Sequence, residues 1–93
     1  MFVIAVLVAV LAAPQIVWVS VKNEMKPRDT LQLFVDDETK PACEAVPEHM
    51  CTSSVEEGTH RFTLKRATDG KVCLEVPPQA VTADLKMEIK ECK

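Results

Sequence analysis

The sequence predicts an all-β domain, a small disulfide-stapled antiparallel β-sandwich or barrel of about five strands. Three observations support this fold class. Apolar and polar residues alternate with a period of two in several segments, as in half-buried strands. No segment has the apolar spacing of a long helix. The chain also holds four cysteines within 93 residues, and a domain of this size is rarely stable on one small apolar core alone.

The first predicted strand covers residues 16–21, IVWVSV, a run rich in β-branched side chains. Residues 22–29 are polar, contain a proline and are expected to form a loop. The second strand is expected over 30–36, with Leu31, Leu33 and Val35 on one face. Because Phe34 interrupts the polar face, we expect this strand to be covered on both sides.

Residues 37–60 show no sustained period and contain two cysteines, two prolines and Gly58. We expect a long loop here that is pinned covalently. A helical turn between the two cysteines fits the residue types, but Pro47 excludes a long helix.

The strongest local signal is a β-hairpin. Residues 61–66 and 71–76 both alternate, and the turn residues Thr68-Asp69-Gly70 lie between them. We expect the second strand of this hairpin to end at Pro77-Pro78, because a proline cannot donate a hydrogen bond to a neighbouring strand.

The last predicted strand lies within residues 84–92, DLKMEIKEC, which alternate most regularly. One face would carry Leu85, Met87 and Ile89, and the other Lys86, Glu88, Lys90 and Cys92. In a helix the same apolar residues would be scattered around the axis, so a strand is favoured.

Four cysteines allow three pairings. Cys73 and Cys92 both fall in the polar register of their strands, and cysteines on the same face of neighbouring antiparallel strands can come within disulfide distance. This favours Cys73–Cys92, with Cys43–Cys51 closing the loop. The main alternative pairs Cys43 with Cys73 and Cys51 with Cys92, which would tie the loop to the sheet.

Residues 1–13 are expected to be a secretory signal peptide. Twelve consecutive apolar residues, from Phe2 to Ala13, precede Pro14, and this run is shorter than the ~20 residues of a membrane span. Cleavage is expected between residues 12 and 20, which leaves one extracellular domain over residues 14–93. Two alternatives stay open: a retained membrane anchor that extends to Val21, and a first strand formed by residues 15–21.

Other function classes find little support in the sequence. The net charge is −3 and basic residues are dispersed among acidic ones, which does not favour a nucleic-acid partner. No nucleophile motif or phosphate-binding glycine loop is present, so we expect no enzymatic activity and no cofactor. The spacings of His49, His60 and the first two cysteines differ from those of structural zinc sites, so no metal site is predicted.

The stretch from Cys43 onward resembles part of an ML (lipid-recognition) domain, the β-sandwich family that includes ganglioside-activator proteins. The similar features are the pair Cys43 and Cys51, then Glu57-Gly58-Thr59 before the strand RFTLK, a proline near Val76-Pro77, and the strand TADLKMEI. Such domains are normally longer and hold more cysteines. The resemblance implies an apolar ligand between two sheets.

We therefore expect a small secreted non-enzymatic binding protein, in the manner of an inhibitor, effector or toxin, that recognises an extracellular protein partner. Loops on a rigid sheet are the usual recognition surface, so the partner is expected to contact loop 37–60 and the hairpin tip 67–70. The candidate contact residues are Glu44, Val46, Glu48, His49, Met50 and Asp69.

Two alternatives follow from other features. A lipid carrier would need a cavity lined by Trp18, Phe34, Phe62 and Met87. A membrane-tethered protein would retain residues 2–21.

Overall fold

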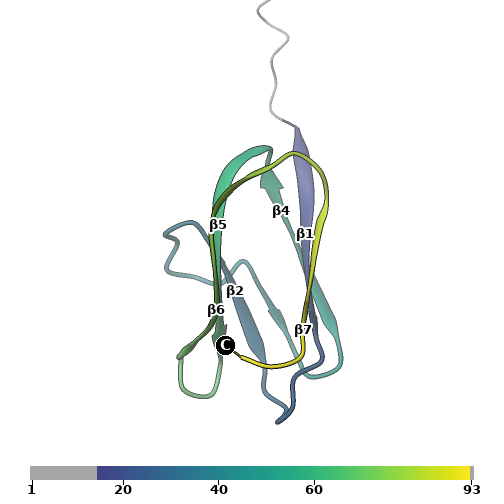
Figure 1. Cartoon of the computed structure of the whole chain (residues 1–93), viewed down its shortest axis with the longest axis vertical. Coiled ribbons are helices and arrows are strands. Elements are labelled where there is room, and N and C mark those ends of the chain that lie inside the picture. The colour runs from purple at the N-terminus through teal and green to yellow at the C-terminus, as the bar shows by residue number, and fades with distance from the viewer. Residues whose placement is uncertain (1–14, 93) are drawn as a thin grey trace, which may run out of the picture.

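The computed structural model describes residues 15–92, and the expected signal peptide lies outside this range. The described chain is all-β, with seven strands in two sheets that stack as a sandwich (Figure 1). The strands are β1 (Ile16–Asn23), β2 (Leu31–Val35), β3 (Cys43–Ala45), β4 (Met50–Glu56), β5 (Gly58–Arg66), β6 (Val72–Val81) and β7 (Leu85–Ile89). The predicted fold class is confirmed as a sandwich, with seven strands rather than about five.

One sheet has three strands in the order β4-β1-β7, and the other has four in the order β3-β2-β5-β6. The pairs are antiparallel except β1 and β7, which run parallel. The strand β1 therefore lies at the centre of its sheet. Residues 16–21 of the apolar stretch thus belong to the sheet, as the alternative of a first strand at 15–21 expects, and β1 extends this strand to Asn23. Within residues 15–92 no helix is long and apolar enough to cross a membrane.

The core lies between the sheets and follows from the period of two. Residues 17, 19 and 21 of β1 and residues 31, 33 and 35 of β2 point inward and are nearly or fully buried. Phe62 and Leu64 of β5 complete the centre of the core. Phe34, on the other face of β2, is only 9% exposed, so this part of the strand is covered on both sides as expected. The Lys65 ammonium lies 4.7 Å from the centroid of the Phe34 ring.

The expectation of a long loop over residues 37–60 is wrong, because this segment contains β3, β4 and the start of β5. The inward positions of β4 are Cys51, Ser53 and Val55, of which only Val55 is buried. This strand therefore carries almost no apolar alternation. It forms because it pairs with β1 along its whole length.

The predicted hairpin is confirmed as β5 and β6, joined by residues 67–71. Gly70 has a φ of 71°, a left-handed conformation that glycine adopts without strain. The expected end of β6 at Pro77-Pro78 is wrong, since β6 continues to Val81. Both prolines lie at a register shift opposite Arg61, in an edge strand, and these are positions where no backbone donor is needed.

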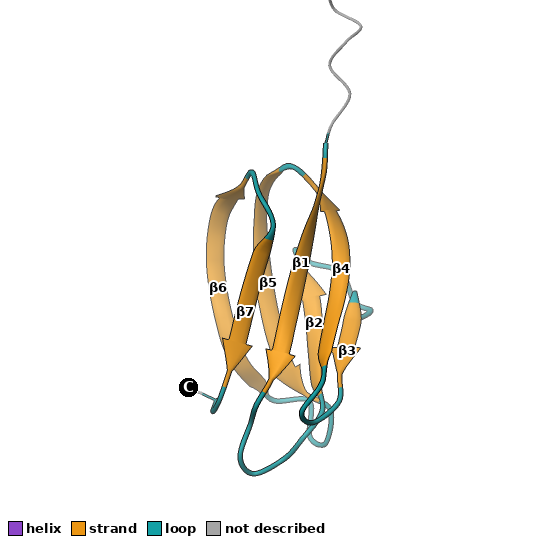
Figure 2. Cartoon of the chain, turned by 90° about the vertical axis from the view of Figure 1, so that its right-hand side faces the viewer, coloured by secondary structure: helices purple, strands orange, loops and turns teal. Residues whose placement is uncertain are grey.

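The structure contains the favoured disulfide pairing, Cys43–Cys51 and Cys73–Cys92. The geometric reason given for Cys73–Cys92 is wrong, because β6 and β7 belong to different sheets. A second register shift places Cys73 in the core, with 1% of its surface exposed, instead of on the polar face. The Cys73–Cys92 disulfide thus joins the sheets at one lateral edge, and the Cys43–Cys51 disulfide joins them at the other. Figure 2 shows β6 and β7 at the first edge and β3 and β4 at the second.

We predict that loss of either disulfide lowers the free energy of unfolding by about 2–4 kcal/mol, because each one restricts the unfolded chain. The Cys73→Ala/Cys92→Ala variant should lose more than Cys43→Ala/Cys51→Ala, since the sequence separations are 19 and 8 residues and Cys73 is buried. Urea unfolding of both variants measures this difference. Equal losses, or a larger loss for the second variant, would contradict the prediction.

Candidate functional site

Three loops meet at one end of the sandwich. They are residues 24–30 between β1 and β2, 46–49 between β3 and β4, and 67–71 between β5 and β6. We call these three loops together the loop end (Figure 2). Of the two surfaces predicted from the sequence, the hairpin tip 67–70 is part of the loop end, but only residues 46–49 of the predicted loop 37–60 are. The remainder of 37–60 forms the connection between β2 and β3, the strands β3 and β4, and the start of β5. The 24–30 loop lies between them and was not predicted as a site.

Asn23 organises the loop end from within. Its side chain is fully buried at the last position of β1, where it follows Val17, Val19 and Val21 in the inward register. The side-chain nitrogen donates to the carbonyls of Asp29, at 2.6 Å, and Ala45, at 2.8 Å. The side-chain oxygen accepts from the Met25 N–H at 3.1 Å. A polar group in an apolar core is stable only when its hydrogen bonds are formed. The Asn23 amide forms hydrogen bonds with both its nitrogen and its oxygen.

The backbone of Asn23 holds the 46–49 loop as well. Its N–H donates to the carbonyl of His49 at 3.0 Å, and its carbonyl accepts from the Glu48 N–H at 2.9 Å. Glu48 has a φ of 68°, which is uncommon for a residue other than glycine and is maintained here by the surrounding hydrogen bonds. One residue thus connects two of the three loops.

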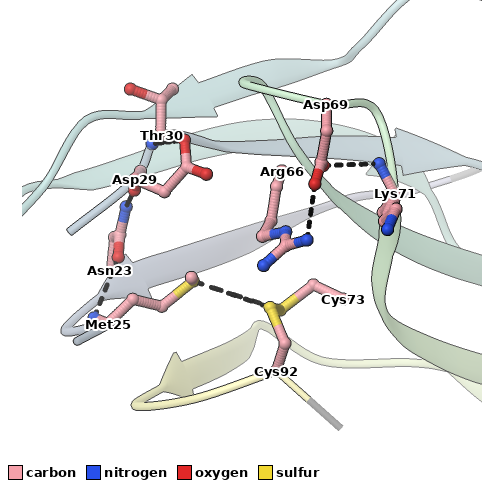
Figure 3. Close-up of a disulfide and its surroundings, with 9 residues drawn as sticks. All are labelled: Asn23, Met25, Asp29, Thr30, Arg66, Asp69, Lys71, Cys73 and Cys92. Carbon is pink, nitrogen blue, oxygen red and sulfur yellow. Dashed lines mark hydrogen bonds and ion pairs between the residues drawn. A yellow bond between two sulfur atoms is a disulfide. The ribbon is translucent and has the colours of Figure 1, made fainter. Parts of the chain in front are cut away.

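The third loop is joined through Asp29 and Thr30. The Thr68 hydroxyl donates to the Asp29 carboxylate at 2.8 Å, and the Ala67 N–H donates to the Thr30 carbonyl at 2.9 Å. Within the hairpin tip, Asp69 accepts from the Lys71 N–H and from Arg66. These bonds, the Lys71 N–H first, lower the pKa of Asp69 below its usual value. The Asp69 carboxylate therefore holds the turn together from within the hairpin (Figure 3).

The predicted contact residues do not all lie together. Val46, Glu48, His49 and Met50 occupy one turn and the start of β4, and Val46 and Met50 are 48% and 53% exposed. Glu44 lies apart on β3, where its carboxylate accepts from the Gln32 amide. Asp69 lies at the neighbouring hairpin tip. Arg28 of the 24–30 loop forms an ion pair with Glu48, with 3.9 Å between its guanidinium and the carboxylate.

The residues expected to line a lipid cavity do not converge. Phe62 is buried in the core, but Trp18 is 52% exposed on the outer face of β1. Phe34 faces outward under Lys65. These side chains therefore do not line a common cavity between the sheets. The sulfur atoms of Cys43 and Cys51 are joined to each other, which leaves them unavailable as zinc ligands.

A polar cluster lies away from the loop end, where the segment after β2 meets β5. The ring of His60 bonds the Asp36 carboxylate at 2.9 Å and the Glu56 carbonyl at 2.6 Å. Both ring nitrogens thus face acceptors, which favours the protonated ring. The hydrogen bond to Asp36 is the main cause of a raised pKa for His60. The Arg61 N–H, followed by His60, lowers the pKa of Asp36.

Comparison of the chain with family models, with curated proteins and with solved structures finds no match in any of the three. The resemblance to the ML family therefore stays a prediction. The function has to be argued from the loop end itself.

We predict that Asn23→Ala costs about 2–4 kcal/mol of unfolding free energy, because it removes three side-chain hydrogen bonds and leaves buried partners without a donor or acceptor. Amide hydrogen exchange should also become faster in residues 24–30 and 46–49. The control is Gln32→Ala, which removes one exposed side-chain bond. Equal effects of the two substitutions would rule out this role for Asn23.

The His60–Asp36 contact predicts a pH-dependent stability. A raised pKa for His60 stabilises the fold fully below the unfolded value of about 6.5, and this contribution is lost as the pH rises through the folded value. The lowered pKa of Asp36 stabilises the fold above about 3.8, and this contribution is lost as the pH falls through the folded value. The stability difference between the native chain and His60→Gln should therefore be largest between these values and decline toward pH 8.

Urea unfolding at a series of pH values measures this difference. His49→Gln, which leaves the His60–Asp36 contact in place, is the control. A difference that stays constant from about pH 5 to pH 8 would refute the proposed coupling.

Proposed function

We propose that this chain is a secreted, non-enzymatic binding protein that recognises an extracellular protein partner through the loop end. The observation that carries the proposal is the meeting of three loops at one end of the sandwich, where hydrogen bonds link them to each other and to the core. Loops on a rigid scaffold are where small β domains usually place recognition. Secretion is supported by the apolar leader in the sequence and by two disulfides, which persist in oxidising compartments.

The chemistry of the loop end suits a protein surface. Val46 and Met50 expose apolar side chains, and Arg28, Glu48 and Asp69 supply charges of both signs around them. Apolar anchors surrounded by polar groups are typical of protein interfaces. Because Asn23 already holds the backbone of residues 46–49, binding would lose little further conformational entropy in this loop.

A site-specific photo-crosslinking experiment tests the proposal. The photoreactive amino acid benzoylphenylalanine replaces Met50 in one variant and Ile16 in another, two positions with 53% and 55% exposure at opposite ends of the sandwich. Both proteins are purified from the medium of eukaryotic cells. Each is then incubated with intact cells that express the chain and with the conditioned medium of those cells. Irradiation at position 50 should give a defined conjugate that excess native protein suppresses.

The control position decides the outcome. A conjugate from position 50 that position 16 does not give would support the loop end as the interface. If only position 16 gives a conjugate, or if position 50 gives none, the loop end is not the recognition surface.

A further inference from the structure

A pocket of about 410 Å³ opens at the loop end, between the first half of the 24–30 loop and the turn that holds Glu48. Its apolar part comes from Met25 and Pro27, and Met25 is only 6% exposed. The remaining lining residues are charged: Lys22, Glu24, Lys26, Arg28 and Glu48. An apolar surface bordered by a few polar groups is the usual composition of a small-molecule site.

The charges of the pocket favour an anion. Three cations face two carboxylates, and each carboxylate already lies near a cation, Glu24 at 3.5 Å from Lys22 and Glu48 at 3.9 Å from Arg28. Exposed ion pairs of this length contribute little stability, so both cations can turn toward a ligand. Among the described residues, Lys26 forms no ion pair.

The pocket is formed before any ligand arrives. Asn23 holds both sides of it, because its side-chain oxygen accepts from the Met25 N–H and its carbonyl accepts from the Glu48 N–H. The Met25 sulfur also packs 4.0 Å from each sulfur of the Cys73–Cys92 disulfide (Figure 3). A site that is already ordered loses little entropy on binding.

We propose that this pocket binds a small amphipathic anion, a molecule with an apolar body and one carboxylate or sulfonate. The apolar body packs on Met25 and Pro27, and the anion pairs with Lys26 and its neighbouring cations. The pocket volume lies within the range of known small-molecule sites, about 300–1,000 Å³. This site is separate from the interior between the sheets, and the inference does not rest on the existence of a protein partner.

The test uses two fluorescent probes that differ in one group. Anilinonaphthalene sulfonate carries the anion, and phenylnaphthylamine is the same ring system without it. We expect the sulfonate to bind the native protein with one-to-one stoichiometry and more tightly than the uncharged probe, and decanoate to displace it. Binding is measured by fluorescence titration at low salt.

Charge variants locate the site. Lys26→Glu should weaken binding of the sulfonate by about three- to tenfold and leave the uncharged probe unaffected. Glu48→Gln should strengthen it, because a competing carboxylate is removed. Lys40→Glu makes the same charge change outside the pocket lining and should have a smaller effect than Lys26→Glu.

Three results would overturn the proposal. They are equal affinity for the two probes, equal effects of Lys26→Glu and Lys40→Glu on sulfonate binding, and binding of several sulfonate molecules with no displacement by decanoate. Circular dichroism of each variant verifies that the fold is retained, so that a loss of binding reports on the pocket.

Discussion

The two sheets of this domain are joined covalently at both lateral edges, and the remaining features depend on that constraint. Cys43 and Cys51 link β3 to β4, and Cys73 and Cys92 link β6 to the segment after β7. The core between the sheets is small, made mainly of Val, Leu and one Phe. A core of this size contributes only a few kcal/mol of net stability. Each disulfide contributes a comparable amount, about 2–4 kcal/mol. The sheets stay aligned although no described strand passes from one to the other.

Asn23 extends this order from the core to the surface. A fully buried amide would destabilise the core if its hydrogen bonds were not formed. Here the bonds to Asp29 and Met25 hold the 24–30 loop, and the bond to Ala45 holds the end of β3. The pocket and the proposed recognition surface lie at the same end because Asn23 orders both the 24–30 and the 46–49 loops. The hydrogen bonds that offset the cost of burying the Asn23 amide are thus among those that order the loop end. The disulfide under Met25 supports the same loop from the other side.

Much of the fold could be predicted from the period of two. Every second residue of β1 is buried, Phe62 and Leu64 alternate with less buried residues in β5, and Leu85, Met87 and Ile89 form the less exposed face of β7. The strand β4 could not, since its inward positions hold Cys51 and Ser53 and its formation depends on pairing with β1. The register shifts between β5 and β6 could not be predicted from the sequence either. They explain why Cys73 is buried and why β6 tolerates two prolines.

Two of the three loops of the candidate site could be predicted as well. The hairpin tip and the broader segment 37–60, which contains residues 46–49, were expected to be recognition surfaces, but the 24–30 loop between them was not. The one available signal was the inward register of Asn23 after three buried valines, which indicates a polar side chain that must find partners inside. Those partners, the carbonyls of Asp29 and Ala45, come from other parts of the chain, and no local pattern indicates them.

The central position of β1 has a consequence for biosynthesis. This strand is made first, but its parallel neighbour β7 begins only at Leu85. A ribosome therefore completes the four strands β2, β3, β5 and β6 of one sheet before the other sheet has its third strand. Until then one edge of β1 keeps unpaired backbone groups, and the thiol of Cys73 has no Cys92 to react with. The nascent chain thus passes through a stage with an open strand edge and a reactive thiol. Chaperones and disulfide isomerases would act mainly at this stage.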